Sequence, residues 1–179
     1  MRIWIVVLML VLGACVGRPS LEDPSLGGPK LDLETFFAGD VIGYGQFQDR
    51  FGTPLRRFEV AIQGSFDGQV LTLVEDFIYE DASTEQRIWR LRKTGEDSWE
   101  GSAPGVLGTA TGEERGDAFN WRYAIDLPVP DGTLRVAFDD WMWRLDEDRV
   151  LNRAYMTKFG VDIGEVIIFF VRQVGQADN

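Results

Sequence analysis

The sequence contains no histidine and one cysteine, Cys15, in 179 residues. The lack of histidine removes the commonest general base and the commonest metal ligand. Because Cys15 is assigned another role below, no thiol remains for a disulfide, a zinc site or nucleophilic catalysis. We therefore expect a protein that is not an enzyme and that uses no metal and no other cofactor.

Positive charge is also scarce, since 18 lysines and arginines stand against 29 aspartates and glutamates, for a net charge of −11. Nucleic-acid binding depends on basic contacts with phosphate, so we expect no nucleic-acid partner. The same balance argues against adsorption of the folded domain to anionic lipid headgroups. Hydrophobic residues make up 45% of the chain, which is enough for a folded core.

A long apolar run occupies residues 3–12, directly after Arg2. It is too short to span a bilayer, which takes about 20 residues, and it matches the core of an export signal. The run ends in Leu12-Gly13-Ala14-Cys15, which resembles the lipobox of bacterial lipoproteins. The resemblance implies that residues 1–14 are a signal peptide and that Cys15 becomes the lipid-bearing first residue. The alternative is an ordinary secretory signal with a chance cysteine.

Two features after the cysteine bear on localisation. Lipoproteins held in the inner membrane tend to have aspartate directly after the lipidated cysteine, and here that residue is Val16. The resemblance therefore implies a cell-envelope protein anchored by Cys15 to the membrane, at the periplasmic face of the outer membrane in a Gram-negative host. The stretch after Cys15, up to residue 30, is rich in proline and glycine and lacks periodicity. Residues 15–30 are thus expected to be the lipidated cysteine and a flexible tether.

From residue 31 to residue 179 the pattern predicts one β-domain. Residues 31–37 could form one or two helical turns, after which alternating apolar and polar residues dominate. The clearest strand is 118–127, and turn signals at 67–68, 94–97, 112–117, 128–132 and 146–148 separate about ten candidate strands. Sequential hairpins favour an all-β fold, an antiparallel up-and-down barrel with a short N-terminal helical turn.

Two family resemblances support this fold. Residues 31–41 look like the opening of bacterial lipocalins, although Val41 stands where those proteins have tryptophan. A closer match is an uncharacterised family of bacterial lipoproteins, domain of unknown function 3833, which implies a lipocalin-like barrel without an established activity. The motifs that carry this resemblance are Phe36-Phe37-Ala38-Gly39, Arg87-Ile88-Trp89-Arg90, Asp139-Asp140-Trp141-Met142 and Asn152-Arg153-Ala154.

Several charged motifs have a catalytic or binding interpretation and a structural one. Asp139 and Asp140 could share a proton, but neighbours in a strand point to opposite faces, so we favour structural roles for both. The acidic run 146–148 lacks the spacing of a calcium loop and is expected to be a solvated hairpin. Arginines recur in the strand patterns and either bind an anionic headgroup or, as we favour, pair with acids on neighbouring strands; they are Arg87, Arg90, Arg92, Arg122, Arg135 and Arg153.

The aromatic stripe Phe119, Trp121 and Tyr123 is the best candidate for a ligand-lining surface. Small barrels either fill their interior or enclose one ligand, and a cavity of about 300 Å³ or more would favour binding. We therefore expect a lipoprotein that binds or carries a hydrophobic ligand such as a lipid or fatty acid. The alternative is a structural or accessory outer-membrane lipoprotein with a filled barrel. The predicted lining residues are Phe58, Val60, Phe119, Trp121, Tyr123 and Phe138.

Overall fold

The computed structural model describes residues 17–23, 28–129 and 132–173. The predicted signal peptide, residues 1–14, and the predicted lipidation site, Cys15, lie outside these residues. One short helix precedes ten strands: α1(Leu33–Phe37), β1(Gly39–Asp49), β2(Pro54–Phe66), β3(Val70–Tyr79), β4(Thr84–Lys93), β5(Ser98–Ser102), β6(Val106–Arg115), β7(Ala118–Val129), β8(Gly132–Arg144), β9(Arg149–Lys158) and β10(Val161–Arg172). No helix in the described part of the chain is long and apolar enough to cross a membrane.

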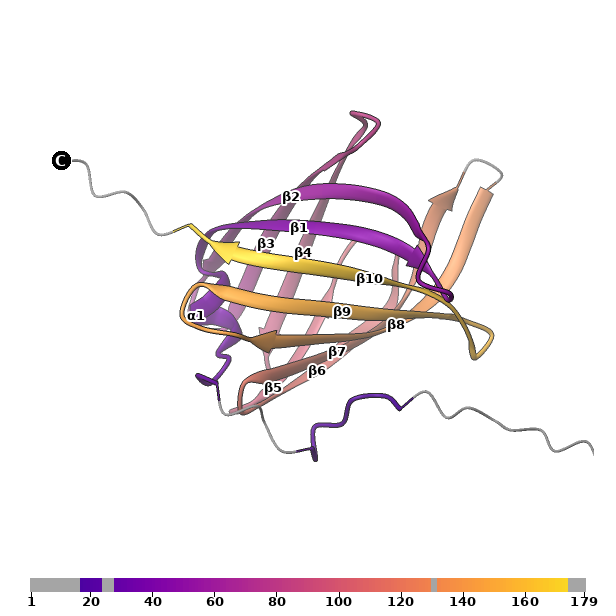
Figure 1. The fold of residues 1–179 in the computed structure, drawn as a ribbon. Coiled ribbons are helices and arrows are strands. Elements are labelled where there is room, and N and C mark those ends of the chain that lie inside the picture. Colours follow the sequence, from indigo (N-terminus) through magenta and orange to yellow (C-terminus); the bar gives the residue numbers. More distant parts are fainter. Residues whose placement is uncertain (1–16, 24–27, 130–131, 174–179) are drawn as a thin grey trace, which may run out of the picture.

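The ten strands form a closed antiparallel barrel (Figure 1). Each strand pairs with its neighbours in sequence, and β1 pairs with β10 to close the barrel, with Val41 opposite Arg172 and Asp49 opposite Gly164. The prediction of an all-β, up-and-down barrel with a short N-terminal helix is confirmed. One predicted turn is wrong, because the tight turn near 112–117 is confined to Gly116 and Asp117 and β6 continues to Arg115.

Alternation along the strands decides which side chains face the interior. In β7, Phe119, Trp121 and Ile125 are at most 4% exposed, whereas Arg122, between them, is exposed. The odd-numbered apolar residues therefore point inward and their even-numbered neighbours outward, as the period of two requires. Large aromatic rings from most of the strands meet in the interior and form the hydrophobic core.

Helix α1 closes one end of the barrel, on the left in Figure 1. Its side chains Leu33, Phe36 and Phe37 are at most 2% exposed and pack onto the interior core. Glu114 of β6 accepts hydrogen bonds from the Leu33 backbone N–H and from Trp99 Nε1, both at 2.9 Å. Because the first backbone N–H groups of a helix lack intrahelical partners, this carboxylate supplies one and fixes α1 in place.

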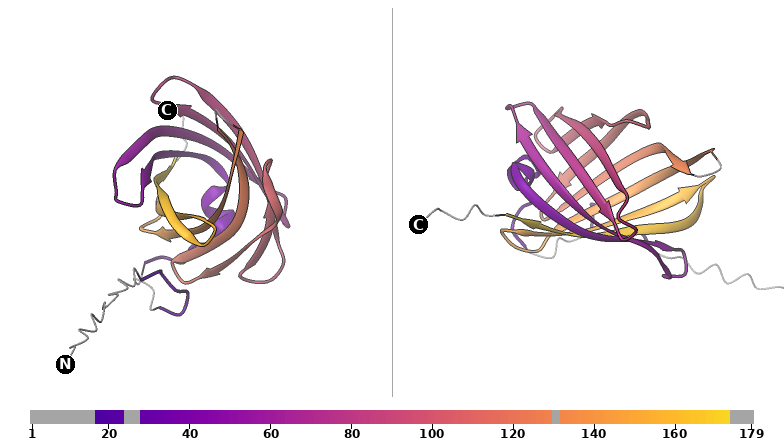
Figure 2. Two further views of the ribbon diagram at one scale, coloured as in Figure 1. Left: turned by 90° about the vertical axis from the view of Figure 1, so that its right-hand side faces the viewer. Right: turned by 90° about the horizontal axis from the view of Figure 1, so that it is seen from above.

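The opposite end of the barrel, here called the distal end, is where β1, β3, β7 and β9 finish and β2, β4, β8 and β10 begin. In Figure 2, left, the barrel is viewed from this end, with α1 visible at the far side. Residues 17–23 and 28–32, which precede α1, contact the barrel at opposite ends. Arg18 forms an ion pair with Asp162 near the distal end, and the Leu31 N–H donates to Gly116 O (2.9 Å) at the α1 end.

Candidate functional site

The barrel encloses a cavity of about 120 Å³. Its wall runs from Leu33 and Phe37 of α1 to Phe47 and Tyr79, near the distal ends of β1 and β3. Most of the lining is aromatic or aliphatic, so an apolar group is the natural occupant. The volume is smaller than the roughly 300–1,000 Å³ of typical small-molecule pockets. The interior is thus narrowed by its own side chains but not filled by them.

All six residues predicted to line a ligand site lie on this cavity wall. The structure brings together Phe58, Val60, Phe119, Trp121, Tyr123 and Phe138, which come from β2, β7 and β8. Tyr123 stacks on Phe138 with ring centroids 5.1 Å apart. Trp89 of β4 was not predicted. Its ring makes T-shaped contacts with Tyr123 and Trp121, with ring centroids 5.1 and 5.7 Å apart. Whether a ligand binds there stays a prediction.

Glycines on the inner wall make room for the aromatic rings. A Cβ at Gly112 would lie 2.4 Å from the Trp121 ring and 2.7 Å from the Phe119 ring. A Cβ at Gly45 would lie 2.4 Å from the Phe58 ring. Rings can therefore lie close against the sheet at these positions, which leaves the centre of the barrel less crowded.

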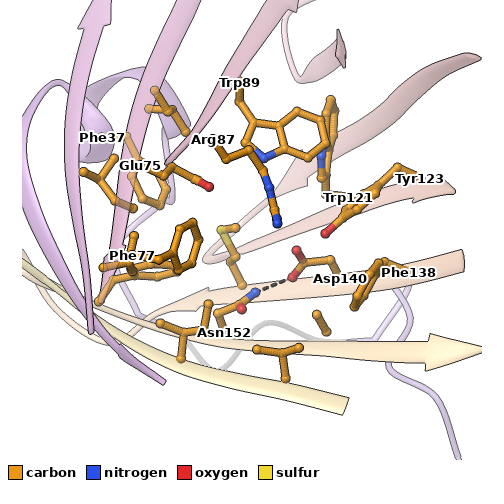
Figure 3. Close-up of a pocket in the computed structure, with 18 of the residues that line it drawn as sticks. Phe37, Glu75, Phe77, Arg87, Trp89, Trp121, Tyr123, Phe138, Asp140 and Asn152 are labelled. Atoms are coloured by element: carbon orange, nitrogen blue, oxygen red, sulfur yellow. Dashed lines mark hydrogen bonds between the residues drawn. The ribbon is translucent and has the colours of Figure 1, made fainter. Parts of the chain in front are cut away.

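A polar cluster interrupts the apolar wall (Figure 3). It consists of Glu75 of β3, Arg87 of β4, Tyr123 of β7, Asp140 of β8 and Asn152 of β9. Figure 3 shows the Arg87 side chain reaching in from its strand, with Asp140 and the Tyr123 hydroxyl on one side and Glu75 on the other. The Asn152 side chain donates to Asp140 Oδ1, and its Nδ2 also donates to Trp141 O at 3.0 Å.

Burial changes the acidity of the two inward carboxyl groups. Desolvation raises the pKa of Asp140 to about 7, although the hydrogen bond from Asn152 acts to lower it. Desolvation also raises the pKa of Glu75 to about 7, although the Arg87 charge acts to lower it. Glu75 and Tyr123 keep some accessible surface because they face the cavity, but apolar walls still solvate their charged forms poorly. Burial likewise raises the pKa of Tyr123 well above its ordinary value.

Arg87 is held by a further carboxylate. Its Nη2 lies 2.7 Å from Glu85 Oε1, and the Tyr79 hydroxyl donates to Glu85 Oε2 at 2.8 Å. The single arginine therefore faces Glu85 and Glu75, and Asp140 lies in the same cavity. Above neutral pH, where Glu75 and Asp140 are ionised, the carboxylates outnumber the cation and the cavity opposes entry of a further negative charge.

The charged motifs of the sequence divide between the two faces of the barrel. Asp139 points outward and accepts from Arg122 Nε (3.2 Å), whereas Asp140 points inward, so the two carboxyl groups diverge as expected. Cross-strand pairs also form on the outer surface; they are Arg92–Glu100, Arg135–Asp126 and Arg153–Glu165. Arg87 departs from this pattern because it enters the cavity.

The sequence reasoning predicted Tyr123 but missed the other polar members of the cavity wall, which are Glu75, Arg87, Asp140 and Asn152. Glu75 lies on the same strand face as Leu73 and Phe77. Asp140 lies two residues after Phe138 and therefore on the same face of β8, so the alternation already placed both carboxyl groups inside. A carboxyl group on an otherwise apolar strand face was the usable signal. For Asn152 the sequence held no such signal, because the alternation in its strand is ambiguous.

The described residues include no group of three or more side chains suited to hold a metal ion. What the cavity offers is an apolar space with hydrogen-bonding groups at one side. Two carboxyl groups with pKa values near neutrality can accept or donate a proton, or bind a hydrogen-bond donor on a ligand.

Comparison with known proteins now places the chain. The model of the family described as "Protein of unknown function (DUF3833)" matches residues 9–172. The chain belongs to this family. The predicted resemblance to domain of unknown function 3833 is thereby confirmed. None of the curated proteins matches.

Solved structures show that this DUF3833 protein has a fold shared with other barrel proteins. An S-type phycobiliprotein lyase, CPES from Guillardia theta, superposes with a TM-score of 0.58 at 10% identity, over 82% of this chain and 95% of that one. Rv2717c from M. tuberculosis superposes with a TM-score of 0.58 at 17% identity, over 77% of this chain and 93% of that one. These likenesses support the lipocalin-like barrel, and at such identities they concern the fold alone.

Proposed function

We propose that this protein is a lipid-anchored envelope protein whose barrel binds a hydrophobic ligand, such as a lipid or fatty acid, without catalysing a reaction. The observation that carries the proposal is the internal cavity, apolar on most sides and closed at one end by α1. A core that served stability alone would gain from filling this space, because each unfilled volume costs packing energy. Met142 on the wall is flexible enough to move aside for a ligand.

The polar cluster narrows the class of ligand. Glu75, Asp140 and Glu85 face one cation, Arg87, so a fatty-acid anion meets repulsion above neutral pH. A lipid with a hydroxyl or amide group instead donates a hydrogen bond to either carboxyl group. We therefore propose an apolar ligand with an uncharged polar group as the preferred occupant. A fatty acid should bind best at acidic pH, where its own carboxyl and those of the cavity are protonated.

Acylation at Cys15 is the proposed means of anchoring. A protein with several acyl chains stays on a membrane, since each buried methylene contributes about 0.8 kcal/mol. Intact mass of the protein purified from membranes should show Cys15 as the acylated first residue. Cys15→Ala should give a folded protein released from the membrane, and an unmodified Cys15 in the parent would refute this anchor.

A structural or accessory lipoprotein with a filled barrel is the rival function. The observation in its favour is the cavity volume of about 120 Å³, below the range of typical ligand pockets. Such a protein would act through its outer surface and would bind no lipid in its interior.

Calorimetric titration of the Cys15→Ala protein distinguishes the two functions. A monoacylglycerol should bind at pH 8, and the fatty acid with the same chain should bind at least tenfold more weakly. Trp121→Ala should weaken the binding of the monoacylglycerol, because Trp121 lines the cavity. Tyr44→Ala is the matched control, since Tyr44 is 52% exposed on the outer face of β1. A parent protein that binds neither lipid would favour the rival.

A further inference from the structure

Exposed apolar side chains collect at the distal end of the barrel. Phe159 is 96% exposed and Phe51 is 79% exposed, so neither belongs to the core. By contrast, Leu145 is the large apolar side chain exposed in the loops of the α1 end, within the described residues. The exposed large hydrophobic side chains at or next to the distal loops are Phe51, Leu55, Ile78, Val129, Phe159 and Val161. We call these six residues the distal apolar rim.

Phe159 occupies a backbone position that disfavours it. The hairpin between β9 and β10 has two loop residues, Phe159 with φ 52° and Gly160 with φ 77°. Two positive φ values in a two-residue hairpin favour Asn-Gly, since bulky residues rarely adopt the left-handed region. Phe159 thus serves neither the core nor the turn, which points to a contact outside the barrel.

The charge of the loops differs between the two ends. The loops of the distal end that the structure describes hold three charged residues, Arg50, Glu80 and Asp81. The loops between strands at the α1 end hold seven acidic residues; they are Asp67, Glu96, Asp97, Asp117, Asp146, Glu147 and Asp148. Two of these acids are paired, Asp97 with Lys30 of the segment before α1 and Asp146 with Arg149. The loops of the distal end therefore repel lipid phosphates less than the loops of the α1 end do.

The N-terminal segment reaches the barrel near the same end. The Arg18 guanidinium pairs with Asp162 and lies 3.8 Å from the centre of the Tyr155 ring. Asp162 is the second residue of β10, three residues after Phe159. Cys15 precedes Arg18 by three residues, a distance of at most roughly 10 Å even in extended chain.

We infer that the distal apolar rim is a membrane-docking surface, which inserts into the bilayer that holds the acyl chains of Cys15. Phe51 and Phe159 enter the interfacial layer. Arg50 and Lys158, whose charged groups lie 4.8 and 5.7 Å from the respective ring centres, reach the headgroup phosphates. This orientation turns the distal end of the barrel toward the lipid. The inference rests on the proposed acylation, and it goes beyond the proposed function because it concerns the outer surface.

Fluorophores at single cysteines test the docking surface. Because Cys15 carries lipid in the acylated protein, Phe51→Cys, Phe159→Cys and the control Leu145→Cys each offer one free thiol for an environment-sensitive dye. The three proteins are reconstituted in phosphatidylcholine vesicles that contain a lipid-borne quencher. We expect dyes at 51 and 159 to lose at least half of their emission, and the dye at 145 to lose little. Equal quenching at all three sites, or stronger quenching at 145, would overturn the inference.

Two further measurements address the alternatives. Intact mass before labelling shows whether Cys15 is acylated. An unacylated protein would overturn the placement at the membrane but would leave the proposal of ligand binding by the barrel unaffected.

Sedimentation of the Cys15→Ala protein, with and without Phe51→Ser and Phe159→Asn, tests whether the distal apolar rim joins two copies of the protein. A monomer in both cases supports the membrane, whereas a dimer that these substitutions dissociate would overturn it.

Discussion

At the scale of single residues, Trp121 is the most informative position in the cavity wall. It is 4% exposed and its ring stacks on Phe119 with centroids 5.7 Å apart. If the interior is hollow and holds a ligand, Trp121→Ala should weaken ligand binding more than it weakens the fold. If the interior is a filled core, the same change should cost about 3–5 kcal/mol of stability. Chemical denaturation alongside calorimetric titration separates these outcomes.

Asp140 makes stability depend on pH. Its pKa is about 7 in the folded protein and near 4 in the unfolded chain, so the folded state binds the proton more tightly. The contribution of Asp140 to stability is therefore greatest below about pH 4, declines as the pH rises to about 7 and then levels off. Asp140→Asn should flatten this decline and raise the melting temperature at pH 8 relative to the parent. An unchanged pH profile of melting would contradict the assigned pKa.

Phe159 should be replaceable at a gain in stability. Asparagine tolerates the left-handed backbone better than phenylalanine does, so Phe159→Asn should stabilise the fold by roughly 1 kcal/mol. The same variant should dock less well on phosphatidylcholine vesicles. Thermal melts check the first effect, and a drop in melting temperature would show that Phe159 has a role inside the fold.

At the scale of elements, Gly112 of β6 decides how close the Trp121 and Phe119 rings lie to the sheet. Gly112→Ala would place a methyl group 2.4 Å from the Trp121 ring and force that ring toward the cavity. We expect this variant to lose lipid binding and to melt at a lower temperature. Gly17→Ala is a suitable control, because a Cβ there meets nothing within 4 Å. Equal behaviour of the two variants would show that the ring has other room.

The elements themselves were largely predictable, and the reason lies in burial. Strand 118–127 alternates because one face of β7 packs inside and the other meets solvent. The error at 112–117 arose because Gly112 was interpreted as a turn residue, whereas it serves as a space for the Trp121 and Phe119 rings. Contacts between strands that face each other across the interior could not be predicted from the pattern within each strand. The approach of Glu75, Arg87 and Asp140 depends on how β3, β4 and β8 curve around a common interior.

At the scale of the whole molecule, the two ends of the barrel differ in their exposed apolar residues and in the charge of their loops. The α1 end is plugged by buried side chains and bordered by acidic loops, whereas the distal end carries exposed phenylalanines and lies near Arg18. This polarity and the apolar interior are the observations behind our proposal of a container with its distal end toward a membrane. The described loops between strands hold seven acidic residues at the α1 end and two, Glu80 and Asp81, at the distal end.

Native mass spectrometry of the protein, released gently from its host membrane, tests the central claim most directly. The account predicts a fraction of molecules carrying one extra non-covalent lipid besides the acyl chains of Cys15. That lipid should be uncharged, and it should be reduced in Gly112→Ala but retained in Gly17→Ala. A protein that carries no such lipid, and that takes up none from added monoacylglycerol, would contradict the claim and identify the interior as a core.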